Sequence, residues 1–265
     1  MYDIHIHVGN FNEGLYFSPE EISRDMNALN VERYYFSSTS TGSIPFRYVK
    51  NEIEELISLS EGRAIPFLWV SPGMLKHSAN LKPYFFREFA GIKIHGLQGW
   101  QPYGKEIRRV FGIARDKNLP VMLHTGEHEI CRAGAYMKIC SEFHDVKIIL
   151  AHGRPIDECI DVMNECPNVF ADTAFMPVND IVRLKNENLI HRVLWGTDFP
   201  VMRYFYDIPV REYYRQRIHE VINAIGHEDF EMISEKNAGP KIFHSDLQKI
   251  FTSRSLNSER KLQSV

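Results

Sequence analysis

The sequence lacks several features that would place it in a specialised class. It has four cysteines, and none of them form a Cys-x-x-Cys pair. No basic stretch followed by an apolar core stands at the N-terminus, and no apolar run reaches the roughly 18 residues that a membrane span needs. We therefore expect a reduced, cytoplasmic protein that does not enter a membrane.

An excess of charge of one sign is missing as well. The 265 residues give a formal net charge of -3 and a pI near 6.5, which excludes a strong electrostatic footprint for nucleic acid or anionic membrane. With 44% hydrophobic and 25% charged residues, the chain can bury a large core. We expect a small-molecule substrate as its partner, and a homo-oligomer is left open.

What the sequence does contain is a regular alternation of strand-like and helix-like segments. The expected strands are residues 2–8, 32–39, 64–72, 91–96, 120–126, 146–153, 169–174 and 193–200. The expected helices are residues 18–30, 46–61, 74–89, 105–118, 130–144, a segment opened by Pro155, and residues 178–188, 210–224 and 228–244. Such an alternation, without a linker or an internal repeat, predicts a parallel sheet built from βα units.

The number of expected strands favours one α/β fold in particular. Eight strands favour a closed (β/α)8 TIM barrel in a single domain, with an open doubly wound sheet as the alternative. The alternative would carry a Gly-x-Gly-x-x-Gly turn after its first strand, and this chain has none there. We assign residues 1–252 to the barrel and residues 253–265 to a polar C-terminal tail.

The first expected strand has two chemically different faces. Alternation of side chains puts Asp3, His5 and His7 on one face and the apolar residues between them on the other. Two imidazoles at this spacing have Cβ atoms roughly 6.5 to 7 Å apart, so both can bind one divalent cation. They could equally line a polar sheet face without a metal, and further ligands are needed to decide between the two interpretations.

Further candidate site residues follow at the C-terminal ends of other strands, where the active sites of barrels lie. These residues are Lys93, His95, His124, His152 and Asp198. Nitrogen and carboxylate donors suit zinc, with manganese, iron or nickel as alternatives. Zinc lowers the pKa of a bound water from about 15.7 to about 7. Asp198 could hold the proton of that water and pass it to a leaving group, while His152 polarises a carbonyl or orients the water.

Six short motifs carry a family resemblance across nearly the whole chain. They are Asp-Ile-His-Ile-His from residue 3, Gly-Ile-Lys-Ile-His from 91, Leu-His-Thr-Gly from 123, Ala-His-Gly from 151, Val-Phe-Ala-Asp-Thr from 169 and Leu-Trp-Gly-Thr-Asp-Phe-Pro from 194. The chain resembles the amidohydrolase superfamily, in particular the metal-dependent amidohydrolase 2 group that also contains decarboxylases of small carboxylic acids. The resemblance implies a metal held by His5, His7, His124 and Asp198, with His152 as a catalytic partner. Because the chain starts at the first strand, we expect no flanking β-sandwich.

Two neighbouring families share the opening motif but fit poorly. TatD-like DNases carry a glutamate ligand in a Gly-Glu-x-Gly-Leu-Asp segment, which this chain lacks. Phosphoesterases of the polymerase-and-histidinol-phosphatase type do not match the Leu-His-Thr-Gly and Gly-Thr-Asp-Phe-Pro segments. We set both families aside.

Lys93 bears on how many metal ions the site would hold. An ammonium about 4 Å from a divalent ion would be repelled by roughly 8 kcal/mol at an effective dielectric constant of 20. Either Lys93 is carboxylated and bridges two metals, as in some relatives, or it points at a substrate carboxylate farther out. We favour the second arrangement, and therefore one metal, Zn²⁺ or another divalent ion such as Mn²⁺, over two.

Further pocket candidates are predicted from their positions after the strands. The residues predicted to contact the substrate are Arg47, His95, Trp100, Glu127 and Arg154, with a solvated loop or a structural role as the alternative for each. Asp172 could bond a ligand histidine or act as a structural cap.

Three functions are compatible with these residues. The first is hydrolysis of an amide, lactone or ester bond by metal-activated water, in a small substrate that we expect to be carboxylated. The second is a metal-dependent lyase reaction, decarboxylation or hydration, in the same superfamily. The third is a barrel that binds a metal or ligand without turnover, which would not need His152 and Asp198 as proton-transfer partners. We favour a metal-dependent hydrolase with Asp198, His152 and Lys93 as its catalytic residues.

Overall fold

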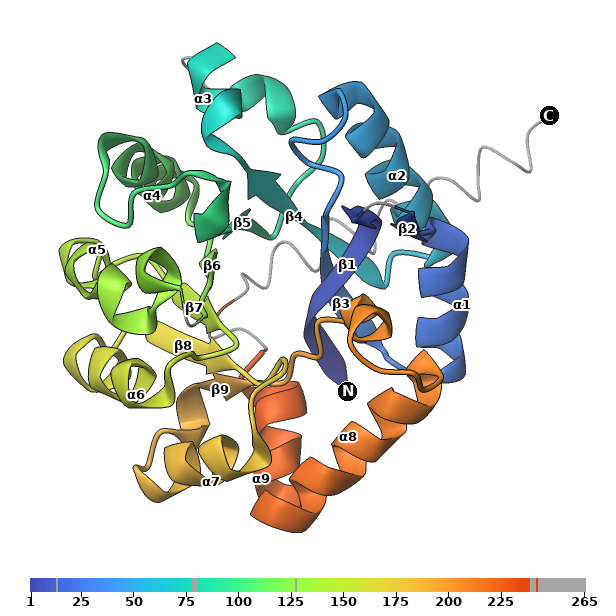
Figure 1. Ribbon diagram of the computed structural model, residues 1–265, viewed down its shortest axis with the longest axis vertical. Coiled ribbons are helices and arrows are strands. Elements are labelled where there is room, and N and C mark those ends of the chain that lie inside the picture. Colours follow the sequence, from blue (N-terminus) through green and yellow to red (C-terminus); the bar gives the residue numbers. More distant parts are fainter. Residues whose placement is uncertain (13, 78–80, 127, 239–241, 243–265) are drawn as a thin grey trace.

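The computed structural model describes residues 1–12, 14–77, 81–126, 128–238 and 242, and Figure 1 shows how they are arranged. A curled sheet forms the centre, and the helices surround its outer side. The predicted tail, residues 253–265, and the predicted substrate contact Glu127 lie outside the described residues.

The sheet contains nine strands in the order β2-β1-β3-β4-β5-β6-β7-β8-β9 among the described residues. Neighbouring strands are parallel except for β2, which pairs with β1 in the antiparallel direction. The strands are β1 Tyr2–Asn12, β2 Leu15–Phe17, β3 Arg33–Ser38, β4 Ala64–Val70, β5 Gly91–Ile94, β6 Val121–His124, β7 Ile148–Ala151, β8 Val169–Asp172 and β9 Val193–Leu194. The predicted mixed α/β fold with a parallel sheet is confirmed in these strands, and the short hairpin strand β2 was not predicted.

Backbone hydrogen bonds also connect β1 to the segment that follows β9. The amide of Ile4 donates to the carbonyl of Trp195 at 3.0 Å, and the amide of His7 donates to that of Phe199 at 2.8 Å. In the other direction, the amide of Asp198 donates to the carbonyl of His5 at 2.8 Å. The first and last parts of the sheet therefore lie side by side.

Helices follow most of the parallel strands. They are α1 Pro19–Ala28, α2 Phe46–Leu59, α3 Pro72–His77, α4 Lys105–Lys117, α5 Met137–Glu142, α6 Ile156–Glu165, α7 Val178–Asn186, α8 Val210–Ile225 and α9 His227–Glu231. Short 3-10 helices are η1 Lys82–Tyr84, η2 Gly96–Gln98, η3 Glu129–Cys131, η4 Ala133–Tyr136, η5 Ile190–Arg192 and η6 Val201–Tyr204, and a π-helical turn, η7, covers Met232–Lys236. Among the described residues, every helix is too short or too polar to cross a lipid bilayer.

The start of α1 follows its sequence signals. The side chain of Ser18 accepts a hydrogen bond from the amide of Glu21 at 3.2 Å, and Pro19 occupies the first helical position. Proline is tolerated there because the first amides of a helix have no intrahelical partner. The predicted N-cap of this helix is confirmed.

Two predicted helices are divided into shorter pieces in the structure. Among the described residues of the segment predicted as a helix over residues 74–89, the end of α3 and the short η1 are helical, and residues 85–89 are not. Pro83 lies in the first turn of η1, a position typical of the start of a helix. The segment predicted over residues 130–144 is divided into η3, η4 and α5, because the amide of Ala133 donates to the carbonyl of Arg154 at 2.9 Å instead of continuing one helix.

The strands send alternate side chains into two separate buried clusters. On β7, Ile148 and Leu150 belong to the larger cluster, which also contains helix side chains, whereas Ile149 belongs to the smaller one. On β6, Val121 and Met122 are divided in the same way. The smaller cluster therefore covers the inner, concave face of the sheet. We call it the inner apolar cluster, and its buried members are Ile4, Tyr35, Ile65, Phe67, Ala90, Met122, Ile149, Ala151, Phe170, Leu194, Ala238 and Ile242.

Candidate active site

The site begins on β1, where His5 and His7 are both buried and both line the main pocket. The pairing of β1 with β3 shifts register between Asp3 and Ile6, so strict alternation does not hold over this segment. Ile4 packs in the inner apolar cluster, and Asp3 does not line the pocket. The prediction that Asp3 shares a face with the two histidines is therefore wrong.

Asp3 instead connects β1 to the segment after β9. Its carboxylate accepts hydrogen bonds from the amide of His5 at 3.0 Å and from the hydroxyl of Thr197 at 2.6 Å. Burial raises the pKa of Asp3 to about 7, although these hydrogen bonds oppose the shift. This contact holds the backbone around His5 next to the backbone around Asp198.

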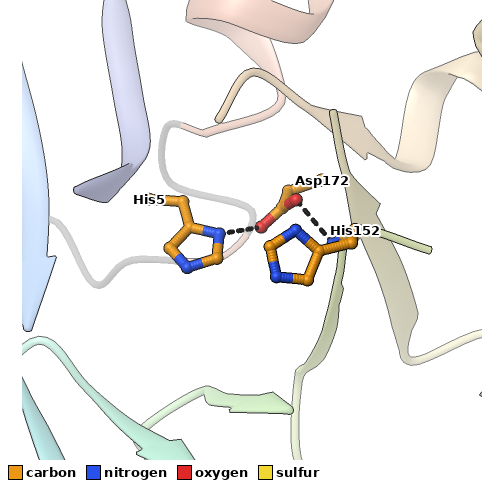
Figure 2. A group of neighbouring side chains, drawn as sticks. All are labelled: His5, His152 and Asp172. Carbon is orange, nitrogen blue, oxygen red and sulfur yellow. Dashed lines mark hydrogen bonds and ion pairs between the residues drawn. The ribbon is translucent and has the colours of Figure 1, made fainter. Parts of the chain in front are cut away.

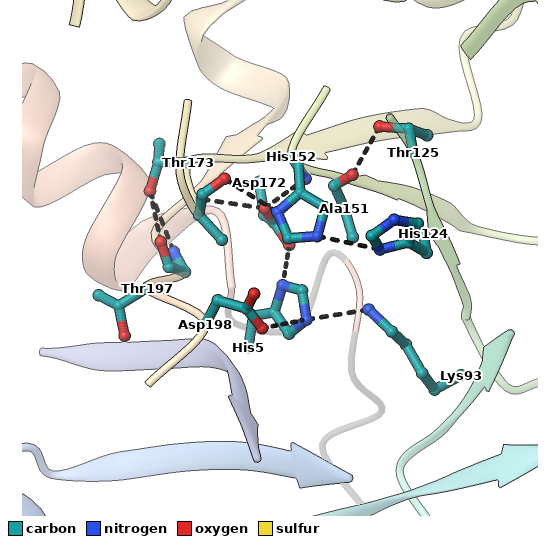
Figure 3. A network of polar contacts seen from close by, with 12 residues as sticks. His5, Lys93, His124, Thr125, Ala151, His152, Asp172, Thr173, Thr197 and Asp198 are labelled. Atoms are coloured by element: carbon teal, nitrogen blue, oxygen red, sulfur yellow. Dashed lines mark hydrogen bonds and ion pairs between the residues drawn. The ribbon is translucent and has the colours of Figure 1, made fainter. Parts of the chain in front are cut away.

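Three donor atoms, two from the middle of β1 and one from the segment after β9, converge at one place. The Nε2 atoms of His5 and His7 are 3.2 Å apart. Oδ1 of Asp198 lies 3.2 Å from Nε2 of His5 and 2.7 Å from Nε2 of His7. Asp198 has a positive φ of 59°, which turns its side chain back toward β1. Figure 3 shows Asp198 beside His5, within the network of polar contacts around it. We call these three residues the donor triad.

The charges of the donor triad are set by burial and by one another. Burial alone would raise the pKa of Asp198, but its interactions with His5 and His7 hold it well below its usual range. Burial lowers the pKa of His7, and Asp198 opposes that shift. The triad thus presents an ionised carboxylate next to imidazole nitrogens.

Asp172, at the end of β8, orients His5 from the other side. Figure 2 shows its carboxylate between His5 and His152. Oδ2 lies 2.8 Å from Nδ1 of His5, while Oδ1 accepts from the amides of His152 at 2.8 Å and Ala174 at 3.0 Å. A carboxylate at this position selects the His5 tautomer with hydrogen on Nδ1, so that Nε2 keeps a lone pair for the triad. The structure contains both predicted alternatives, because Asp172 bonds the predicted ligand His5 and also caps the amides of His152 and Ala174.

Lys93 reaches the same place from β5. Its side chain is 1% exposed, and its Nζ lies 2.9 Å from Nε2 of His5. Burial lowers the pKa of Lys93 to about 8, although the charges of Asp198 and Asp172 oppose the shift. An ammonium in this position competes with any cation for the lone pair of His5.

His124 and His152 form a second pair next to the triad. Nε2 of His152 lies 3.2 Å from Nδ1 of His124, and Nδ1 of His152 bonds the carbonyl of Ala174 at 3.0 Å. Burial lowers the pKa of His152 to about 4 and that of His124 well below its usual value. The group of donor atoms that lie within 4.8 Å of one another contains His5, His7 and Asp198 but not His124. The role of His124 as a fourth ligand stays a prediction.

The predicted residues at the strand ends meet in one cavity of about 510 Å³. Its lining includes His5, His7, Lys93, His95, His124, His152, Arg154 and Asp198. Its volume is within the range of small-molecule sites. Topology therefore brings all seven strand-end candidates and their neighbour Arg154 together, as the parallel sheet predicted.

Two predicted substrate contacts lie elsewhere. Trp100 is 1% exposed and packs in the larger, outer cluster, because Gly99, with φ of 88°, turns the chain back toward the core after η2. Arg47 is exposed at the start of α2, and its guanidinium lies against the ring of Tyr48. Neither of them lines the cavity.

Several lining residues were not predicted. Trp69, on β4, stacks on His95 with ring centroids 5.8 Å apart and donates its indole N–H to Gln98 at 2.8 Å. His95 in turn stacks on His124 at 3.8 Å. Trp69 could have been found, because it stands two positions beyond Phe67 at the C-terminal end of an expected strand. The other unpredicted lining residues include Phe11, Thr125, Phe175 and Phe205.

Comparison with protein-family models decides the family. The model described as Amidohydrolase matches residues 87–239, which is more than half of the chain. The chain belongs to the amidohydrolase family. The resemblance inferred from the six sequence motifs is thereby confirmed, and the matched region contains Lys93, His124, His152 and Asp198. A search of curated proteins gives no match.

Solved structures of amidohydrolase-like proteins share the fold. A probable 2-pyrone-4,6-dicarboxylic acid hydrolase from Acinetobacter baumannii with citric acid bound is 13% identical, with a TM-score of 0.64 over 91% of this chain and 98% of that one. An amidohydrolase from Burkholderia multivorans with bound zinc is 11% identical, with a TM-score of 0.64 over 91% and 98%. A 5-carboxyvanillate decarboxylase from Sphingomonas paucimobilis is 13% identical, with a TM-score of 0.62 over 92% and 98%. At these identities the likeness concerns the fold.

Proposed function

We propose that this amidohydrolase-family member is a metal-dependent hydrolase that cleaves an amide, lactone or ester bond of a small carboxylated substrate. The fold that we propose for it is a closed, single-domain (β/α)8 barrel, supported by the hydrogen bonds between β1 and residues 195–199. The observation that carries the function is the donor triad, His5, His7 and Asp198, at the floor of the cavity. We propose Zn²⁺ or Mn²⁺ as the metal, one ion per site, with His124 as a further ligand.

The donor triad fits a divalent cation in spacing and chemistry. Tetrahedral zinc with ligand bonds of about 2.0 to 2.1 Å requires ligand atoms about 3.3 Å apart. Two of the three separations in the triad are 3.2 Å, and the third is 2.7 Å. Oδ1 of Asp198 is buried and has no well-formed hydrogen bond among the described residues, as expected for an atom that has a cation as its partner.

A bound divalent cation acidifies water and polarises a carbonyl group, and this is the chemistry that we expect it to supply. The chain's own groups then move the proton. Asp198 is ionised, and we assign its carboxylate to accept a proton from water and deliver it to the leaving group. His152 is neutral at pH 7 because its pKa is about 4. A neutral imidazole can orient the water or the substrate carbonyl without adding positive charge to the site.

Two cationic side chains support a carboxylated substrate. Lys93 is in contact with the donor triad, and Arg154 lines the same cavity while its guanidinium bonds the carbonyl of Phe175. Both can pair with a substrate carboxylate, Arg154 in a bidentate manner. Carboxylation of Lys93 would instead remove its positive charge, and the low exposure of this side chain suits either state.

Decarboxylation is the second candidate reaction. It is supported by the fold likeness to a decarboxylase, which is about as close as the likeness to a hydrolase. The same residues would serve, because the metal could polarise a carbonyl or hydroxyl group and a protonated side chain could deliver a proton to carbon. The two reactions differ in whether water is consumed.

A substrate panel separates these reactions. The full-length protein, supplied with Zn²⁺ or Mn²⁺, is assayed on lactones, esters and amides of small carboxylic acids and, in parallel, on hydroxybenzoates and related acids. We expect hydrolysis in the first set, lost on chelation and restored by added metal. Release of carbon dioxide from the second set with an inert first set would establish the lyase instead. Full activity after verified metal removal would refute both, and metal binding without any turnover would favour a non-catalytic barrel.

A further inference from the structure

The cavity has two chemically opposite ends. Its floor consists of the donor triad with Lys93 and His152, all of them buried ionisable groups. Part of its lining is instead aromatic, and the aromatic residues Phe11, Phe175 and Phe205 come from three different segments of the chain. We call these three side chains the aromatic wall.

The wall starts next to a proposed catalytic residue and extends to the surface. The ring of Phe175 lies 6.2 Å from that of His152 and 5.5 Å from that of Phe205. Phe205 is 59% exposed, and its neighbours Tyr204 and Tyr206 are 57% and 46% exposed. A path along the wall thus begins at the polar floor and ends in solvent.

The backbone at Phe175 is held in an unfavourable conformation. Its φ is 50°, in the left-handed region, which is a genuine outlier for a bulky side chain. The carbonyl of Phe175 accepts a hydrogen bond from the guanidinium of Arg154, and the ring contacts Tyr206 at 6.5 Å as well as Phe205. Strained residues of this kind concentrate at ligand-binding sites, where the surrounding structure holds them in place.

We propose that the substrate is amphiphilic: its reacting group and carboxylate occupy the polar floor, and an apolar ring or alkyl group extends outward along Phe175 and Phe205. This inference rests on the proposed function for the location of the reacting group. Removing the apolar group of the substrate from water against these rings supplies binding free energy. Lactones, esters or amides with an aryl or alkyl substituent remote from the carboxylate are therefore the preferred substrates.

Continuity with the cavity favours a small ligand over a second protein chain as the occupant. Exposed apolar patches mark either ligand grooves or protein interfaces. Here the exposed Phe205 lines the same cavity as the donor triad, and on its far side Phe11 connects to Tyr204 with ring centroids 5.6 Å apart. A chain docked on the wall would cover the entrance through which a substrate must pass.

The test compares two carboxylates that differ only by a ring, butanoate and 4-phenylbutanoate, titrated calorimetrically into the full-length, Zn²⁺-supplied protein. A phenyl group partly buried on the wall is expected to tighten binding about tenfold. Phe205→Ala is expected to reduce this preference to about threefold or less and to leave butanoate binding unchanged. Tyr48→Ala, which removes an aromatic side chain that is 47% exposed but lies outside the cavity lining, is the matched control and should preserve the tenfold preference.

A second variant guards against misfolding. Phe175→Asn removes the ring, and asparagine adopts positive φ more readily than phenylalanine, so relief of backbone strain offsets part of the lost packing while the preference is lost. An unchanged preference in both variants, or an equal loss for both ligands, would overturn the proposal. So would a wild-type dimer that Phe205→Ala converts to a monomer in sedimentation. Because these titrations require no turnover, an inert substrate panel would count against the proposed function and leave this result standing.

Discussion

The inner face of the sheet has two layers of side chains. The lower layer is the inner apolar cluster, which stabilises the fold, and the upper layer consists of the strand residues that line the cavity, to which we assign the chemistry. On β6, Met122 belongs to the inner apolar cluster, and His124, two positions later, lines the cavity. On β4, Phe67 and Trp69 stand in the same relation. Residues two positions apart on a strand are roughly 6.5 to 7 Å apart. The apolar layer and the layer of cavity-lining groups are therefore only two residues apart along each of these strands.

The lower layer determines the electrostatics of the upper one. Ile, Phe and Met side chains pack in the inner apolar cluster beneath the histidines, and burial is the largest cause of the lowered pKa values of His95, His124 and His152. In such surroundings the attraction between opposite charges is stronger than in water. The apolar layer therefore strengthens the electrostatic attraction between the donor triad and a cation, although it contributes no ligand.

The largest expected effect is in the upper layer. Asp198→Asn removes the carboxylate that we assign as ligand and proton acceptor, and kcat on the best substrate of the panel should fall about 10³-fold. The zinc content of the purified variant, measured by atomic absorption, should fall with it. Asp157→Asn breaks an exposed ion pair with Arg183 and is the control, with activity retained. Near-normal activity of Asp198→Asn would contradict the roles of ligand and proton acceptor that we assign to this residue.

A substitution in the lower layer should have the opposite effect, with a loss of stability and no loss of metal. Ile149 is fully buried in the inner apolar cluster, and Ile149→Ala should lower the free energy of unfolding by about 3 kcal/mol. Zinc content per folded molecule should stay normal, because no ligand is changed. Urea denaturation measures the first quantity, and Leu59→Ala, at a side chain that is 44% exposed, should change it by about 0.5 kcal/mol or less. If Ile149→Ala instead lost its metal without loss of stability, the two layers would not be separate.

A smaller effect is expected at Asp172, which connects the triad to His152. In Asp172→Asn the remaining oxygen can still accept from the amide of His152, but the new amide group donates to Nδ1 of His5. His5 would then carry its hydrogen on Nε2 and lose the lone pair that the triad needs. We expect metal affinity, measured by competition with a chelator, to weaken about 10- to 100-fold. The exposed Asp161→Asn variant should bind metal normally, and equal affinities in both variants would contradict this role.

The smallest effect concerns a carboxyl group outside both layers. Glu52 accepts hydrogen bonds from the hydroxyls of Ser38 and Ser40 at 2.9 Å each, and burial raises its pKa, partly offset by these bonds. A raised pKa means that the folded state binds the proton more tightly than the unfolded state. The stabilisation is fully present below the unfolded pKa and is lost as pH rises through the folded pKa.

The stability of the wild type relative to Glu52→Gln should therefore decrease from pH 5 to pH 8. Urea denaturation at both pH values measures this difference, and the exposed Glu165→Gln variant controls for surface charge. A relative stability that increases with pH would show that folding lowers the pKa of Glu52 instead of raising it. Burial would then not raise the pKa of this carboxyl group outside the cavity, whereas it lowers the pKa values of the histidines inside it.

The strand ends were predictable because they carry local signals. Apolar runs that end in histidine, as in residues 120–124 and 146–152, place a polar side chain at the edge of a parallel sheet before any contact is known. The pairing of particular atoms was not predictable in this way. The contact of Asp172 with both His5 and the His152 amide depends on the register between three strands.

Two wrong site predictions, for Asp3 and Trp100, also result from tertiary structure that local sequence does not specify. Asp3 leaves the pocket because β1 shifts register against β3, and no sequence pattern marks that irregularity. Trp100 turns into the core after Gly99, although Lys93 on the preceding strand and His95 directly after it line the cavity. Loop positions near a strand end were treated as pocket positions, and side-chain direction in a loop is decided by tertiary contacts.

The hydrogen bonds between β1 and residues 195–199 have a consequence for the order of folding. They join partners that are separated by nearly the whole described chain, and loop closure over such a distance is a late and entropically costly event. His5 and His7 emerge early during synthesis, but Asp198 reaches them only after the other parallel strands have been made. A nascent chain therefore has no complete donor triad, and a variant that ends before residue 195 should be unable to assemble one.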